Sequence, residues 1–161
     1  MGVRRTGEGS NHFMKRPLFL LILIVLFASI FVSSADAQVQ VRLRAIHASN
    51  AGSNVDPSLR DLYKELGSLF SFTSYRLMKD ENLNLSLNQP ASISAHEGRI
   101  ILEATLVGLH KNMAEIKLRV VREGTEILNT QVRLLPGRTI LVGGPRHLRG
   151  GVVIYALHAR F

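Results

Sequence analysis

The residues whose types and spacing could support binding chemistry lie near the C-terminus. Arg146, His147 and Arg149 stand between two glycine pairs in the stretch GGPRHLRGG, and Arg138 precedes them. Guanidinium and imidazolium groups attract carboxylates and phosphates, so these four side chains are candidate contacts for an anionic partner. A phosphate-binding loop would require a helix after the glycines, with its N-terminal amides facing the anion. The next residues, VVIYALHARF, are typical of a strand instead, so we expect a β-hairpin with a basic tip; a turn that contacts no partner is the alternative.

Other combinations of chemically active residues form no recognisable catalytic or metal-binding pattern. His96 and Glu97 could open a zinc-protease sequence, but position 100 holds isoleucine where that sequence needs a second histidine. The serines lack the flanking glycines of a nucleophile elbow. The six histidines stand at positions 12, 47, 96, 110, 147 and 158, none at ligand spacing from another. We therefore predict a protein that is not an enzyme and that has no cofactor and no metal site.

Charge is unevenly distributed along the chain. Residues 38–126 hold 11 Lys and Arg against 10 Asp and Glu, whereas residues 127–161 hold five arginines and no acid. A region of one sign concentrates partners of the opposite sign. The expected partner is an envelope protein or an anionic surface, either lipid headgroups or an acidic glycan. Nucleic acid is not expected as a partner, because the N-terminus indicates export.

The N-terminus has the features of a secretory signal. The apolar run LFLLILIVLFASIFV, residues 18–32, follows four basic residues and precedes the small residues Ala35 and Ala37. This pattern predicts that residues 1–37 form a signal peptide cleaved before Gln38, and it places the mature protein in the periplasm or cell envelope. The alternative is an uncleaved anchor in the inner membrane, since a spanning helix needs about 20 apolar residues and the run with its flanks comes close. Membrane contact is expected only through this segment, and only if it stays attached.

Residues 38–161, which contain no cysteine, have the length and patterning of a single β-rich domain. Apolar and polar residues alternate over residues 38–48, which is typical of a half-buried strand. Asp56 and Pro57 are favourable residues for the start of a helix, and leucines recur at helical spacing after them. Short alternating segments separated by turn residues follow. We therefore predict a mainly β fold of the α+β type: an antiparallel β-sandwich or rolled sheet with one short amphipathic helix near residues 57–68.

Three finer expectations concern the strands. Lys79–Glu81 is expected to be a turn that separates two strands. Residues 100–109 are expected to form a central strand with both faces apolar, Leu106 on one face and Leu109 on the other. The strand after it is expected to bury one face and to direct Lys117 toward water.

Two short resemblances concern the bacterial envelope. The last strand resembles the final strand of outer-membrane barrels, since Phe161 is terminal and apolar residues occupy alternate positions before it. Gly137–Gly144, GRTILVGG, resembles over eight residues a hairpin segment in the β-domains of secretins, the outer-membrane secretion channels. The predicted function is that of an exported, noncatalytic structural or interaction domain of the bacterial cell envelope, which presents a β-sheet and a basic C-terminal loop to a protein or anionic partner. Two alternatives stay open: a small β-barrel-like protein integrated in the outer membrane, which the first resemblance implies, and an exported hydrolase.

We predict that the mature protein begins at Gln38, because Ala35 and Ala37 occupy the small-residue positions that signal cleavage requires. Mass spectrometry of the protein purified from an envelope fraction measures that terminus. A chain that still begins at Met1 or Gly2 would contradict cleavage and establish the anchored alternative.

Overall fold

The computed structural model of the chain describes residues 1–2, 38–95, 99–147 and 149–161. Most of the expected signal peptide, including Ala35 and Ala37, lies outside these residues, whereas Gln38 is the first residue of the first strand. The elements in chain order are β1 (Gln38–Ser49), the 3-10 helix η1 (Pro57–Leu62), α2 (Tyr63–Leu69), β2 (Ser74–Ser86), β3 (Pro90–Ala95), β4 (Ile100–His110), β5 (Met113–Arg122), β6 (Thr125–Leu134), β7 (Thr139–Arg146) and β8 (Val152–Arg160).

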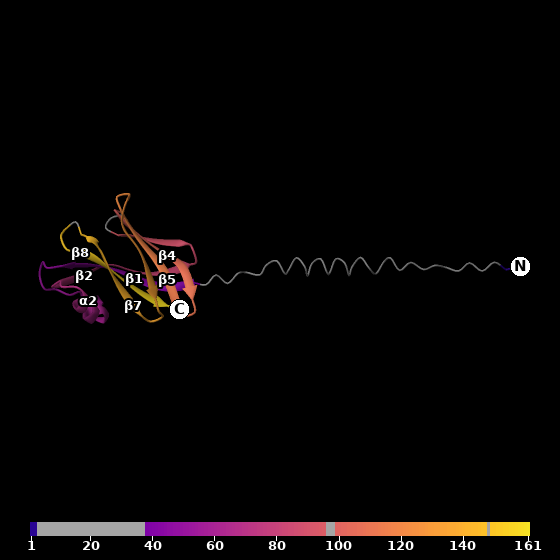
Figure 1. Cartoon of the computed structure of the whole chain (residues 1–161), viewed down its shortest axis with the longest axis horizontal. Helices are drawn as coiled ribbons and strands as arrows, with labels where there is room; N and C mark the ends of the chain where they lie inside the picture. Colours follow the sequence, from indigo (N-terminus) through magenta and orange to yellow (C-terminus); the bar gives the residue numbers. More distant parts are fainter. Residues whose placement is uncertain (3–37, 96–98, 148) are drawn as a thin grey trace. The chain divides into compact units, whose positions relative to one another are not determined.

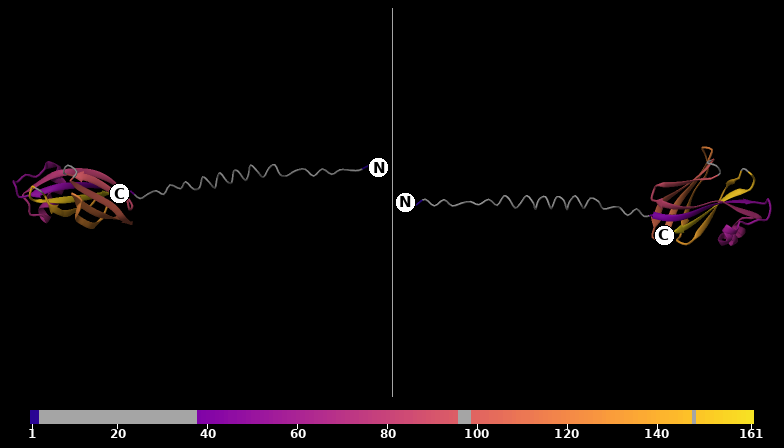
Figure 2. Two further views of the ribbon diagram at one scale, coloured as in Figure 1. Left: turned by 90° about the horizontal axis from the view of Figure 1, so that it is seen from above. Right: turned by 180° about the vertical axis from the view of Figure 1, so that it is seen from behind.

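In the described part of the chain, eight strands form two four-stranded antiparallel sheets that lie as the layers of a sandwich (Figures 1 and 2). Sheet A has the strand order β2-β1-β8-β7, and sheet B has the order β3-β4-β5-β6. The chain passes from one sheet to the other between β2 and β3 and again between β6 and β7. The first and last strands, β1 and β8, pair with each other in sheet A. This architecture confirms the predicted antiparallel β-sandwich with one short helix.

On the inward faces of β1, β4 and β5 an apolar side chain is buried at every second position, as the two-residue period of a strand requires. On β1, Val39, Val41 and Leu43 are fully buried, while Gln38 and Gln40 are exposed. Burial of one valine or leucine contributes roughly 1.5–3 kcal/mol relative to its exposure to water. The facing residues of sheet B are Ile100, Leu102, Ala104 and Leu106 from β4, and Ala114, Ile116, Leu118 and Val120 from β5.

A second apolar core lies between the outer face of sheet A and the helix. Asp56 caps the start of the helix, since its Oδ1 accepts hydrogen bonds from the amide and the hydroxyl of Ser58 at 2.9 and 2.6 Å. Figure 2 shows the helix beside the purple and yellow strands of sheet A. Because the helix covers it, β1 is buried on both faces over its C-terminal half, and the prediction of a half-exposed strand is wrong there. The buried residues of this core are Leu59, Leu62 and Leu66 from the helix, Ile46 and Ala48 from β1, Tyr75 from β2, and Ile154 and Ala156 from β8.

The helix runs from Pro57 to Leu69, first as η1 and then as α2, and agrees with the predicted helix to within one residue at its end. Not every leucine at helical spacing is buried, since Leu69 is 65% exposed, and Tyr63 beside Leu62 is 57% exposed. The 3-10 segment has three residues per turn rather than 3.6, so Leu59 and Leu62 lie on one face and Tyr63 turns away from it.

β2 runs without a break through Lys79–Glu81, where the sequence predicts a turn, so that prediction is wrong. Arg42 of β1 donates to both carboxylate oxygens of Asp80 at 2.8 and 2.6 Å, and Lys79 forms an ion pair with Glu81. β2 is an edge strand of sheet A, and these side chains are only partly buried, so the strand tolerates a run of charges.

β4 is an inner strand of sheet B, as predicted, but its outer face is not covered. Ile101 on that face is 40% exposed. The register between β4 and β5 shifts between Leu106 and Gly108, which leaves Val107 as a bulge. The bulge reverses the faces that follow, so Leu109 packs on the same inner core as Leu106. The predicted placement of these two leucines on opposite faces is therefore wrong.

Leu102→Asp should destabilise the domain severely, whereas Lys117→Asp should change its stability little. Leu102 is 1% exposed in the inner core, where an unpaired carboxylate costs several kcal/mol, while Lys117 is exposed as predicted and its replacement costs about 0.5 kcal/mol or less. Thermal unfolding of the two variants measures the difference, and because both introduce the same residue, each is a control for the other. Equal shifts in Tm would contradict the assignment of faces.

Candidate interaction site at the β7–β8 hairpin

The stretch GGPRHLRGG forms the end of the β7–β8 hairpin, as predicted, but its first part belongs to a strand. β7 continues to Arg146, which pairs with Val152 of β8, and the connection between them occupies residues 147–151. The register slips between Gly143 and Arg146, so the residues between them leave the regular ladder. The first glycine pair therefore lies in β7 and the second in the connection.

Close packing requires glycine at position 144 but not at position 143. A Cβ atom on Gly144 would lie 2.6 Å from Cε2 of Tyr155 and 2.7 Å from the carbonyl oxygen of Val153. The nearest atom to a Cβ on Gly143 is Cε1 of Phe70, at an ordinary contact distance of 3.5 Å. Burial raises the pKa of the Tyr155 hydroxyl to about 12, so this side chain stays neutral in the core beneath the hairpin.

His147 lies inside the hairpin end rather than on its surface. It is 6% exposed, its ring centroid is 4.3 Å from that of His47 on β1, and its Nδ1 accepts the amide hydrogen of Arg149 at 3.2 Å. His47 places Nε2 2.7 Å from the carbonyl oxygen of Gly150, which acts as the acceptor. His147 therefore fixes the connection against β1, and its placement favours a structural role over the predicted contact with a partner.

Arg146 and Arg149 lie on the surface at this end of the hairpin, as the sequence predicts. The carbonyl oxygen of Arg146 accepts a hydrogen bond from Nη2 of Arg122 at 2.7 Å, which holds the backbone at that point. Within residues 38–95, 99–147 and 149–161, neither guanidinium has a carboxylate in an ion pair. Both exposed guanidinium groups are thus accessible to an anionic group.

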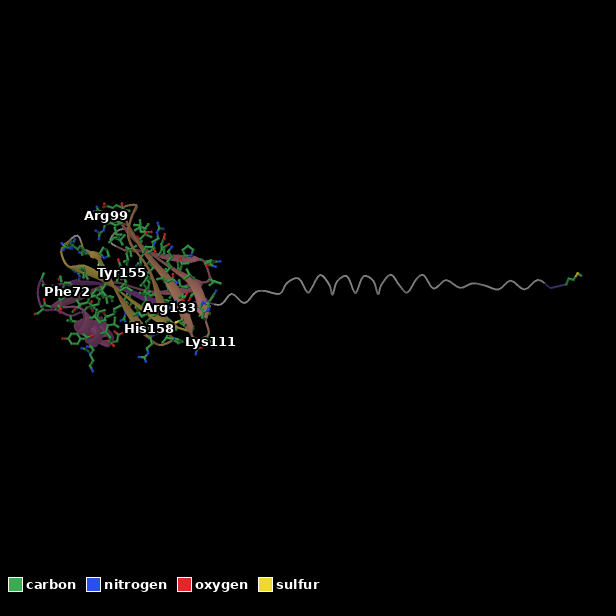
Figure 3. The ribbon with its side chains drawn as sticks, in the orientation of Figure 1. Phe72, Arg99, Lys111, Arg133, Tyr155 and His158 are labelled. Atoms are coloured by element: carbon green, nitrogen blue, oxygen red, sulfur yellow. The ribbon has the colours of Figure 1, made fainter. Side chains whose placement is uncertain are left out.

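Arg138 lies at the other end of β7 from Arg146. Its neighbour Thr139 pairs with His158 near the end of β8, whereas Arg146 pairs with Val152 at its start. Eight residues of extended strand, at about 3.3 Å each, separate the two arginines by about 26 Å. Figure 3 labels His158, which marks the Arg138 end of the hairpin. Arg146, at the end of β7, and Arg149, in the connection, therefore lie at one end of the hairpin, and Arg138 lies at the other.

A group of charged residues that the sequence analysis missed lies on the outer face of sheet A, beside the helix. Arg44 is only 2% exposed, and it donates to both carboxylate oxygens of Asp61 at 2.9 and 2.7 Å. Hydrogen bonds from arginine lower the pKa of Asp61 and of Asp80 below the ordinary value, while burial and then the charge of Arg160 lower the pKa of His158. Arg44 and Asp61 are 17 positions apart on different elements, so no local pattern predicts their contact.

A hollow of about 500 Å³ opens beside α2. The rings of Tyr63, Phe72 and Tyr75 line it together with Lys64, and Figure 3 labels Phe72 there. Among the described residues its lining contains one cation and no carboxylate, and these residues do not form a pair of groups for acid–base chemistry. The hairpin end remains the better candidate for an interaction site.

Comparisons of the chain with family models, curated proteins and solved structures gave no match. None of the helices among the described residues has both the length and the apolar character needed to cross a membrane. Over the same described ranges, no three histidine, cysteine, aspartate or glutamate side chains gather in a way that could hold a metal ion.

Gly144→Ala should destabilise the domain by about 2 kcal/mol, because the added methyl group overlaps the Tyr155 ring and a backbone carbonyl. Gly143→Ala is the matched control and should change stability by less than about 1 kcal/mol, since its neighbours leave room. Chemical denaturation measures both values. If the two variants lose equal stability, the close packing of β7 on Tyr155 is incorrect.

Proposed function

We propose that residues 38–161 act as an exported, noncatalytic structural or interaction domain of the bacterial cell envelope. In this proposal sheet A and the basic hairpin end are presented to a protein or anionic partner. The observation that supports it is the exposure of Arg146, at the end of β7, and of Arg149, in the connection that His147 holds against β1. A pre-organised backbone lowers the ordering cost of binding, so even weak charge contacts gain in effect.

The partner chemistry follows from the sign and the location of the charge. Residues 127–161 contain five arginines and no acid, so the hairpin region attracts carboxylates or phosphates. Of these arginines, Arg133 forms an ion pair with Glu115, which leaves the hairpin arginines as the principal source of attraction. Exposed contacts of this kind are each worth about 0.2–1 kcal/mol, and they weaken as salt rises.

The proposed location rests on the N-terminal pattern of basic residues, apolar run and small residues that ends at Ala35 and Ala37. Cleavage before Gln38 would release the domain into the periplasm, and an intact segment would tether it to the inner membrane. The membrane-integrated and hydrolase alternatives stay predictions. Extraction of the overexpressed mature protein with and without detergent tests the first of them, and a screen with ester and amide substrates tests the second.

Replacing both hairpin arginines, Arg146→Gln/Arg149→Gln, should weaken binding to phosphatidylglycerol vesicles or to an acidic glycan about fivefold or more, with the fold retained by circular dichroism. Binding of the unaltered domain should also fall steeply between about 0.1 M and about 1 M salt, as the Debye length shrinks from about 10 to about 3 Å. Vesicle co-sedimentation measures both effects.

Lys111→Gln/Lys117→Gln, which removes the same charge from exposed positions on β5 and the turn before it, is the control and should leave binding nearly unchanged. Absence of binding at low salt, or equal loss in both double variants, would refute the proposed role of the hairpin end.

A further inference from the structure

β7 is an edge strand of sheet A, and its free side offers unpaired main-chain groups. It pairs only with β8 among the described strands. The carbonyl oxygen of Arg138 accepts from the amide of Ala159, and hydrogen-bonded positions alternate along an antiparallel ladder. The amides and carbonyls of Thr139, Leu141 and Gly143 therefore point away from β8. Such a row of unpaired groups is a template for an additional strand.

The other edge strands of the described sheets carry features that discourage strand addition. Charged side chains, a proline or a break in register each interfere with pairing at an edge. In β7, residues 139–143 contain no charge and no proline and keep a regular register against β8, because the strand's own proline, its arginine and its register shift all lie beyond Gly143. By contrast, β2 carries Lys79–Glu81, β3 begins with Pro90, and β6 carries Glu126 and Arg133 and shifts register against β5.

Arginines flank this free edge at both ends. Arg138 precedes β7, and Arg146 and Arg149 lie at its far end, about 26 Å away at about 3.3 Å per residue. We propose that the free edge of β7 binds an extended, acidic segment of a partner protein as an additional strand of sheet A. The segment pairs along Thr139–Gly143, where β7 is regular, and extends to about eight residues so that its acidic side chains reach the arginines near both ends. This inference rests on the proposed function, because it names the partner class and the surface within the same interaction domain.

Charge argues against a second copy of this chain as the occupant. Antiparallel pairing of β7 with β7 would place the Arg138 end of one copy against the Arg146 end of the other, and like charges facing each other are destabilising. An extended segment with acidic ends meets arginines at both ends instead. Lipid headgroups satisfy the charges but provide no main-chain groups for the edge.

The probe that tests the inference is a synthetic peptide of about ten residues, with glutamates at both ends and alternating valine and threonine between them. It is added to the mature domain at low salt, and fluorescence anisotropy gives its Kd. Two N-methylated versions are compared, one methylated at each set of alternate amides. Only one set faces β7 in an added strand, so methylation of that set should weaken binding about tenfold or more, and methylation of the other set should have little effect. Equal effects would overturn strand pairing.

Hydrogen exchange measured residue by residue locates the bound peptide. The amides of Thr139, Leu141 and Gly143 should gain protection when the peptide binds, and unchanged exchange at these amides would overturn the inference.

Arg138→Gln and Arg146→Gln should each raise the Kd about threefold, with Lys111→Gln/Lys117→Gln as the control. A peptide with lysines at its ends that binds as tightly as the glutamate peptide would overturn the charge requirement. Self-association of the domain that the peptide displaces would identify a second copy as the occupant instead.

The two proposals fail in different ways. If phosphatidylglycerol vesicles bind through Arg146 and Arg149 while the peptide does not bind, the strand inference is wrong and the proposed function stands. If the peptide binds with the alternating methylation effect while Arg146→Gln/Arg149→Gln leaves vesicle binding unchanged, strand pairing stands and the proposed role of the hairpin end in binding anionic surfaces is wrong.

Discussion

The pairing of the first strand with the last is the constraint on which the rest of the structure depends. β1 and β8 lie at the centre of sheet A, and each buries one face in the inner core and much of the other beneath the helix. This two-sided burial offsets the entropy lost when the ends of the domain are brought together. The same pairing places the hairpin end next to β1, where Gly151 approaches the carbonyl of Ala48 and His147 contacts His47.

Signals that are local in the sequence were sufficient to predict the sandwich and its helix. Alternation identifies a strand, and Asp56 identifies the helix start, without knowledge of what either will contact. Features that depend on which elements meet could not be predicted. Arg44 occupies a polar position of an alternating strand, and only the helix above it makes it buried. The residue types of Lys79–Glu81 are typical of a turn, and only the pairing with β1 shows that they belong to a strand. Leu109 lies on the inner face because of a bulge, which the alternation of apolar and polar residues does not reveal.

In the candidate site, too, features set by local sequence could be predicted, and contacts between distant residues could not. Exposure of Arg146 and Arg149 could be predicted because charged residues between glycines usually face water. The burial of His147 between them could not, since its ring partner comes from β1 at the other end of the domain sequence. Arg138 is near these residues in the sequence, but the extended strand between them places it about 26 Å from Arg146. Proximity in sequence therefore did not predict that Arg138 lies apart from the other two arginines.

Arginine side chains have two different roles in sheet A: one is buried and paired with a carboxylate, and others are exposed at the hairpin end. The nearly buried Arg44 requires the carboxylate of Asp61 from its own chain, because a guanidinium taken from water without a partner would be costly. Arg146 and Arg149 remain hydrated and need no such partner, so folding leaves their charge available. In the proposed complex this charge acts at long range and is screened by salt, whereas the main-chain groups of β7 act only at contact and are insensitive to salt. A simple polyanion can satisfy the first requirement, but only an extended acidic chain satisfies both, which is how the same edge would distinguish a protein partner from other anions.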